Sequence, residues 1–227
     1  IAVYSAHTCY DMAEGGINTA LAGALGLRNC LPLWEERPGD PASRRLGLVG
    51  DLPCAMSREE LAAGVEEALG LPQNYVRHLP QAGPETVCRV AVCGGAGSDF
   101  LGEAVNAGCQ AYLTGEVRRH EYLEAERMGL LLLDGGHFAT ENIAMPVLRE
   151  QLAKALPEVE VRLSRQATDQ RPPALPPRGW PFKKDPPRAI RPRAGFYAFV
   201  TFCRSVLLLY VVESLQLQQM LVLGSGI

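Results

Sequence analysis

His137 and Glu141 form a pair of potential metal ligands that follows an apolar segment. They come after residues 130–134, LLLLD, and a Gly-Gly pair, which together predict a buried strand and a tight turn into a helix. If the helix begins near His137, both side chains leave the same face of its first turn and can hold one cation between them. A structural interpretation is also open: a neutral histidine at a helix start, and a glutamate that offsets the helix dipole.

A second segment, residues 1–25, has the same strand, loop and helix order. Its polar loop holds His7, Thr8 and Asp11, and Gly15-Gly16 precede the predicted helix. Asp11 follows the strand, and open α/β sheets gather ligands at the carboxyl ends of their strands. An aspartate in a loop can equally be a turn or cap residue.

Two further segments end a predicted strand in glycine. The loop from Gly94 to Ser98 could receive an anion on its backbone amides, or its glycines could serve only a tight turn. It matches neither a Walker A motif nor GxGxxG. Glu116 and His120 lie four residues apart after Gly115, so they repeat the spacing of the first pair.

Five segments in order resemble the Nif-three-like dinuclear metal centre family, also known as GTP cyclohydrolase I type 2 homologues. The resemblance covers roughly residues 1–165. The segments are VYSAHT-x-x-D-x-A-x-G-G-I-N (3–18), GLVGDL (47–52), VAVCGGAGSDFLGEA (90–104), AYLTGEVRRHEYLEA (111–125) and GGHFATE (135–141).

The resemblance implies a centre of two divalent metal ions, with Asp11, His137 and Glu141 as three of its ligands. It places Glu116 and His120 near that centre, as catalytic residues that contact the ligands or donate a proton. The remaining ligands would be a histidine pair before residue 3, so we expect the sequence to be a fragment of a longer reading frame. The three ligands could hold a lone cation, whereas two metals would bind weakly, and metal content should rise if the upstream residues were restored.

The resemblance also implies a function. We expect a metal-dependent hydrolase of the GTP cyclohydrolase I type 2 homologue kind, whose unidentified small-molecule substrate would be a purine nucleotide by the family name. The alternative is a non-catalytic metal-binding scaffold or interaction subunit. Either would be a homo-oligomer, by resemblance a homohexamer, and a His-His pair encoded upstream would favour the enzyme.

Strands and helices alternate along the chain, which predicts an α/β fold around a mainly parallel mixed sheet. Ser57 and Glu60 form a capping-box pair at the start of one helix. We expect strands at 1–5, 45–51, 75–79, 87–93, 111–114, 130–133 and 158–163, and helices at 16–25, 57–69, 100–107, 120–128 and 139–156.

The segment 166–227 differs from the domain at 1–165. Eight of the 17 prolines lie between residues 172 and 192, which predicts an extended linker. The apolar run at 196–212 contains Arg204, which would cost roughly 2.5–3.5 kcal/mol in mid-membrane, so a membrane span is disfavoured. We expect this run to be disordered or weakly helical, and the whole tail to lie outside the core and to be dispensable for the fold.

Charge and cysteine content narrow the class of protein. The net charge is −3, but residues 1–170 hold 23 acidic against 14 basic side chains, and this acidic body argues against nucleic-acid binding. The seven cysteines are scattered without a CxxC pair, which indicates free thiols in a reducing cytoplasm.

Overall fold

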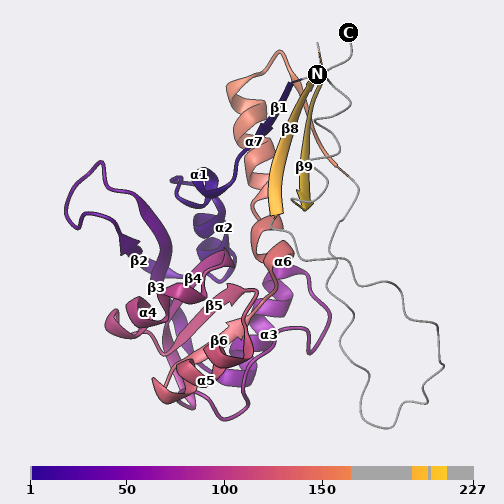
Figure 1. The fold of residues 1–227 in the computed structure, drawn as a ribbon. Coiled ribbons are helices and arrows are strands. Elements are labelled where there is room, and N and C mark those ends of the chain that lie inside the picture. The colour runs from indigo at the N-terminus through magenta and orange to yellow at the C-terminus, as the bar shows by residue number, and fades with distance from the viewer. Residues whose placement is uncertain (1, 165–195, 204–205, 214–227) are drawn as a thin grey trace, which may run out of the picture.

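The computed structural model describes residues 2–164, 196–203 and 206–213 (Figure 1). Its helices are α1 (Thr8–Asp11), α2 (Ile17–Ala24), α3 (Arg58–Leu69), α4 (Leu101–Asn106), α5 (Arg119–Arg127), α6 (His137–Asn142) and α7 (Met145–Ala155), with a 3-10 turn η1 at Ser98–Phe100. Its strands are β1 (Ala2–Ser5), β2 (Arg28–Glu35), β3 (Arg45–Ser57), β4 (Thr86–Ala96), β5 (Ala111–Gly115), β6 (Leu131–Asp134), β7 (Glu160–Leu163), β8 (Phe196–Cys203) and β9 (Val206–Glu213).

A five-stranded mixed sheet forms the body, in the order β2-β3-β4-β5-β6. The pairs β2/β3 and β3/β4 are antiparallel, whereas β4/β5 and β5/β6 are parallel. The predicted α/β class is therefore confirmed. The three parallel strands β4, β5 and β6 have their carboxyl ends at one edge of the sheet. The glycine turns at the ends of these strands therefore lie along that edge.

Apolar side chains on the two faces of this sheet enter two separate cores. In β4, Val90 and Val92 pack with α2 and α3, whereas Ala91 and Cys93 pack with α4 and α5. Successive strand residues point to opposite faces, so an unbroken apolar strand serves both cores. The helices on both faces leave the strand ends as the place for polar side chains.

The start of α3 confirms the predicted capping box. Ser57 Oγ accepts a hydrogen bond from Glu60 N at 3.2 Å, and Glu60 Oε2 accepts one from Ser57 N at 2.8 Å. Two of the backbone amides that lack an intrahelical partner at this helix start are thereby paired.

Three sequence predictions differ from the structure. The single helix expected at 139–156 is wrong, because it divides into α6 and α7, and Pro146 in the first turn of α7 cannot continue an earlier helix. Residues 75–79 form one isolated bridge, between Arg77 and Asp134, instead of a strand. The edge strand β2 was not predicted. It contains Pro32, and proline is tolerated in a strand at the edge of a sheet.

A second sheet has the order β1-β8-β9-β7 and lies beside α7 (Figure 1). The backbone of β8 pairs antiparallel with β1 and β9, and β9 pairs parallel with β7. The expectation of a disordered or weakly helical run at 196–212 is therefore wrong. The predicted proline-rich linker lies outside the described residues, and the dispensability of 166–227 for the fold stays a prediction. In the part of the chain that the structure describes, no helix is long and apolar enough to span a membrane.

Candidate metal centre

The turn that carries His137 is held in place by its neighbours. Asp134 Oδ1 accepts a hydrogen bond from Gly136 N at 2.9 Å, and Gly136 has a φ of 84°, a conformation that favours glycine. A Cβ atom on Gly115, at the end of β5, would lie 2.6 Å from His137 N. This close approach fixes the start of α6 against the carboxyl end of β5.

His137 and Glu141 contact each other across the first turn of α6. Their Nε2 and Oε1 atoms are 2.9 Å apart, and both side chains are largely buried. The prediction that the two share one helix face is confirmed. On the other side of the ring, Nδ1 lies 3.2 Å from Glu116 Oε2, and Glu116 adopts a positive φ of 57° directly after β5.

The imidazole of His137 lies between two carboxylates. Burial by itself lowers its pKa, but the hydrogen bonds to Glu116 and Glu141 outweigh burial and raise the pKa to about 9. Near neutral pH the ring is therefore an imidazolium, and both of its nitrogens can donate.

Asp11 reaches the same place from the opposite end of the sequence. It is the last residue of α1, and among the described residues its buried Oδ1 has no hydrogen-bond partner. Burial, followed by the charge of Glu141, raises the pKa of Asp11 to about 7, while the charge of His137 opposes the rise. The carboxyl groups of Asp11 and Glu141 are therefore near enough to repel each other, with His137 beside them.

The glycine loop at the carboxyl end of β4, residues 94–98, faces inward. The amides of Gly94, Gly95 and Gly97 donate to the side chains of Asn18, Thr140 and Thr114 at 2.9, 3.1 and 2.9 Å. These three amides are engaged within the protein, which favours the turn interpretation over an anion site.

Gly95 also forms one wall of the site. A Cβ atom there would lie 2.8 Å from Glu141 Oε1 and 3.2 Å from His137 Nε2. Asn18 and Thr140, which bind this loop, were not predicted as site residues, although both belong to the segments GGIN and GGHFATE that carry the family resemblance.

The remaining predicted histidine, His120, does not join this group. Its side chain is 67% exposed on α5, and its Nε2 lies 3.9 Å from Glu121 Oε1. Of the two residues expected near the metal ligands, the structure brings only Glu116 into contact with His137.

The donors, carboxylates and an imidazole, suit a divalent cation in kind. Asp11 Oδ1 is buried without a partner among the described residues, and a cation would relieve its repulsion with Glu141. However, within 2–164 and the described parts of β8 and β9, no group of three or more His, Cys, Asp or Glu side chains is placed to hold a metal ion. His137 Nε2 is hydrogen-bonded to Glu141 Oε1, so a cation held between them would have to open this hydrogen bond. The common centre for the three ligands stays a prediction.

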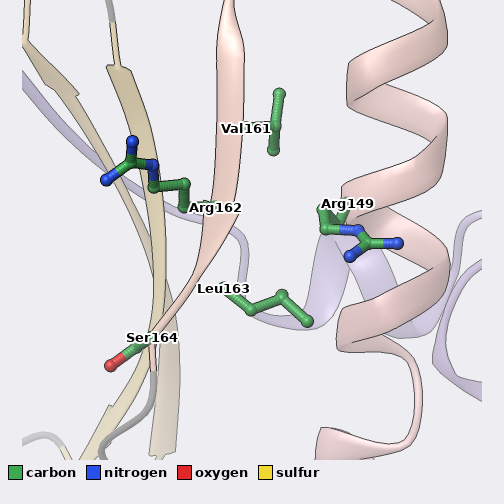
Figure 2. Close-up of a pocket in the computed structure, with 5 residues that line it drawn as sticks. All are labelled: Arg149, Val161, Arg162, Leu163 and Ser164. Atoms are coloured by element: carbon green, nitrogen blue, oxygen red, sulfur yellow. The ribbon is translucent and has the colours of Figure 1, made fainter.

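A hollow of about 730 Å³ lies elsewhere, between α7 and β7 (Figure 2). Val161 and Leu163 point across it toward Arg149 on α7, whereas Arg162 and Ser164 point to the other side of β7. No predicted site residue lines this hollow.

The fold and this cluster define an α/β protein with a group of three carboxyl side chains and a histidine near the carboxyl ends of its parallel strands. Residues 1–170 match the Duf34/NIF3 (NGG1p interacting factor 3) family, and the chain belongs to that family.

Known relatives agree with this assignment. The chain is 36% identical over 171 residues to a protein of Nostoc sp. named GTP cyclohydrolase 1 type 2 homolog, an alignment that covers 75% of this chain and 63% of the relative. The chain thus spans less than two thirds of that relative's length. Among solved structures, it is similar to one described as protein ybgI of unknown function, with a TM-score of 0.56, 31% identity and coverage of 65% of this chain and 55% of the other.

A further structure supports the fold alone. A Bacillus cereus protein described as related to NIF3 has a TM-score of 0.66 and 21% identity, and the match covers 74% of this chain and 72% of that protein.

Proposed function

We propose that the protein is a metal-dependent hydrolase of the GTP cyclohydrolase 1 type 2 homologue kind, with a divalent cation held by Asp11, His137 and Glu141. One observation carries the proposal: Asp11 Oδ1, far from α6 in sequence, is buried without a hydrogen-bond partner among the described residues, and burial and the charge of Glu141 raise the pKa of Asp11 to about 7. Burying this carboxyl group near the charge of Glu141 does not stabilise the fold, whereas a cation between the two groups would stabilise both ionised forms. A buried carboxyl group with a perturbed pKa is found often at functional sites.

The residues of the site would have separate roles in holding the cation and orienting its ligands. Asp11 and Glu141 would supply carboxylate oxygens and His137 would supply Nε2. Glu116 would accept a hydrogen bond from His137 Nδ1–H and so orient the ring. When bound, the cation supplies Lewis acidity that makes water nucleophilic at neutral pH. His120, exposed on α5, stays a proposal as a proton donor.

A purine nucleotide is the proposed substrate class. It is supported by the name that the relatives carry. The carboxylates of the site would repel the phosphates of such a substrate, so its approach would require the cation as well.

Co²⁺ binding would test the proposal, followed by the visible absorption of the ion as it is added to the metal-free full chain. We expect binding in the wild type and at least tenfold weaker binding in Asp11→Asn, because the amide is a poorer ligand without charge. Glu124→Gln, which removes an exposed carboxylate on α5, is the matched control and should bind like the wild type. Hydrolysis of GTP, followed by chromatography, should require the added metal. Equal binding by Asp11→Asn and the wild type would contradict the proposal.

A non-catalytic metal-binding scaffold is the second candidate, favoured by the position of His120, the proposed proton donor, whose side chain is 67% exposed on α5. It predicts Co²⁺ binding without turnover of any nucleotide. For either function we propose a cytoplasmic homohexamer, and sedimentation velocity would measure the assembly.

A further inference from the structure

Asn18 connects the backbone of Asp11, at the end of α1, to the backbone of Gly94 near the end of β4. It is 4% exposed at the start of α2. Its Nδ2 donates to Asp11 O at 2.9 Å, and its Oδ1 accepts from Gly94 N at 2.9 Å. Both ends of one amide are therefore used, one of them on the backbone of a proposed ligand residue.

Thr140 joins the α6 turn to the next residue of β4. It is fully buried, and its Oγ1 accepts from Gly95 N at 3.1 Å. The same hydroxyl lies 2.9 Å from Gly136 O and 3.0 Å from His137 O, and its single proton can be donated to either carbonyl. The turn that presents His137 is thus tied to the residue adjacent to the one that Asn18 holds.

The two ties meet at a place where the backbone has no room for a side chain. A Cβ atom on Gly94 would lie 2.5 Å from Ile17 Cγ2, and one on Gly95 would lie 2.8 Å from Glu141 Oε1. Helix α2 and the Glu141 carboxylate therefore approach the backbone of β4 closely from both segments. The distance between these segments is set by Gly94 and Gly95 and the two side chains that bind them.

We propose that Asn18 and Thr140 are positioning residues, which hold Asp11 and the His137–Glu141 pair at a fixed spacing across the Gly94-Gly95 peptide. This inference rests on the proposed metal-binding function. The two side chains bind the backbone carbonyls of Asp11 and His137, so their loss would change where these donors lie. Removing hydrogen bonds that orient metal ligands typically weakens metal binding 10- to 100-fold.

Co²⁺ affinity of the full chain, measured well below the unfolding temperature of each variant, would test this inference. Thr140→Val keeps the shape but removes the hydroxyl, and Asn18→Ala removes the amide; each should weaken binding at least tenfold. Thr140→Ser restores the hydroxyl and should bind within about threefold of the wild type. Val65→Ala, in the core under α3, is a destabilised control and should also bind within about threefold.

The outcomes separate the inference from the function beneath it. If Asp11→Asn loses Co²⁺ while Thr140→Val and Asn18→Ala bind like the wild type, the positioning role is overturned and the metal site stands. If Val65→Ala weakens binding as much as Thr140→Val, general destabilisation explains the result and the inference is overturned. If the wild type binds no Co²⁺, the proposed function fails, and the inference fails with it. Either Thr140→Val or Asn18→Ala suffices if the other does not fold.

Discussion

The glycine turns at the carboxyl ends of β4 (residues 94–98) and β6 (residues 135–136) look alike in sequence, but their polar groups have different partners in the fold. Both follow a buried strand and lead into a helical turn. The backbone amides of the β4 turn donate hydrogen bonds to side chains from α2, α6 and β5. In the β6 turn, Gly136 N donates to the side chain of the preceding Asp134, and His137 faces two carboxylates. A strand followed by glycines therefore indicates a tight turn. The partners of its polar groups decide whether the turn only holds neighbouring segments together or itself carries a side chain of the site.

The two turns also differ in charge. The ionisable side chain at the β4 turn is the thiol of Cys93, whose pKa is raised to about 12 by burial and by nearby Asp11, so it stays neutral. The β6 turn carries the imidazolium of His137, with its pKa raised to about 9 by its carboxylate partners against the effect of burial. The β4 turn is therefore neutral near pH 7, whereas the β6 turn carries a charge.

The largest effect that would sharpen this comparison is expected from Asp11→Asn in metal-free protein. The folded-state pKa of Asp11 is raised from 3.8 to about 7, so ionisation disfavours the fold, and stability is lost as pH rises from about 4 to 7. At about 1.4 kcal/mol per pKa unit, the cost reaches roughly 4 kcal/mol above pH 7. We expect Asp11→Asn to gain about 3 kcal/mol relative to the wild type between pH 5 and pH 8, measured by urea unfolding.

Asp40→Asn, in the exposed turn between β2 and β3, is the control and should show no such pH dependence. A constant difference between Asp11→Asn and the wild type across this pH range would mean that Asp11 is not buried against Glu141.

A smaller effect is expected from alanine in the β4 turn. In Gly94→Ala the new Cβ would lie 2.5 Å from Ile17 Cγ2, and overpacking of this kind costs about 1–3 kcal/mol. Gly102→Ala, in α4 with nothing within 4 Å, should instead stabilise the protein by up to about 1 kcal/mol through helix propensity. Thermal unfolding measures both, and equal melting temperatures would show that the β4 turn is not closely packed.

Glu116→Gln tests the charged turn with a change of about 1 kcal/mol or less, because the Glu116 side chain is 47% exposed and screened by solvent. The pKa of His137 should fall, since one of the two carboxylates that raise it is lost. A raised histidine pKa stabilises the fold at low pH, and that stability is lost as pH rises through about 9. The variant should therefore lose more stability at pH 6 than at pH 10, and NMR titration of the imidazole would report the pKa directly.

The smallest perturbation is thiol labelling of the folded protein. Cys93 and Cys109 are buried, and burial raises their pKa values to about 12 and about 11, whereas Cys54 and Cys88 are exposed. We expect iodoacetamide at pH 8 to modify Cys54 and Cys88 first, with Cys93 and Cys109 following only on unfolding. Peptide mass spectrometry would measure the order, and early modification of Cys93 would indicate an open β4 turn.

The sequence by itself determined features that depend on neighbouring residues. The start of α6 near His137, the shared face of His137 and Glu141 and the capping box of α3 follow from spacings of three or four residues, which helix geometry converts directly into contacts. Proline was the local signal that was misread, since Pro146 lies in the first turn of α7 and Pro32 lies in an edge strand.

Only the tertiary structure decided which hydrogen bonds and strand pairings connect segments that are far apart in the sequence. Asn18 binds Gly94, 76 residues away, and Thr140 binds Gly95, 45 residues away, and no periodicity in the chain encodes either pairing. The pairing of β8 and β9 with β1 and β7 is of the same kind, because an apolar run does not specify its partner strand. The pKa of Asp11 likewise depends on burial and on Glu141, which approach it only when the sheet has formed. Local propensity selects the elements, while the closure of the chain selects their neighbours and the charges that face one another.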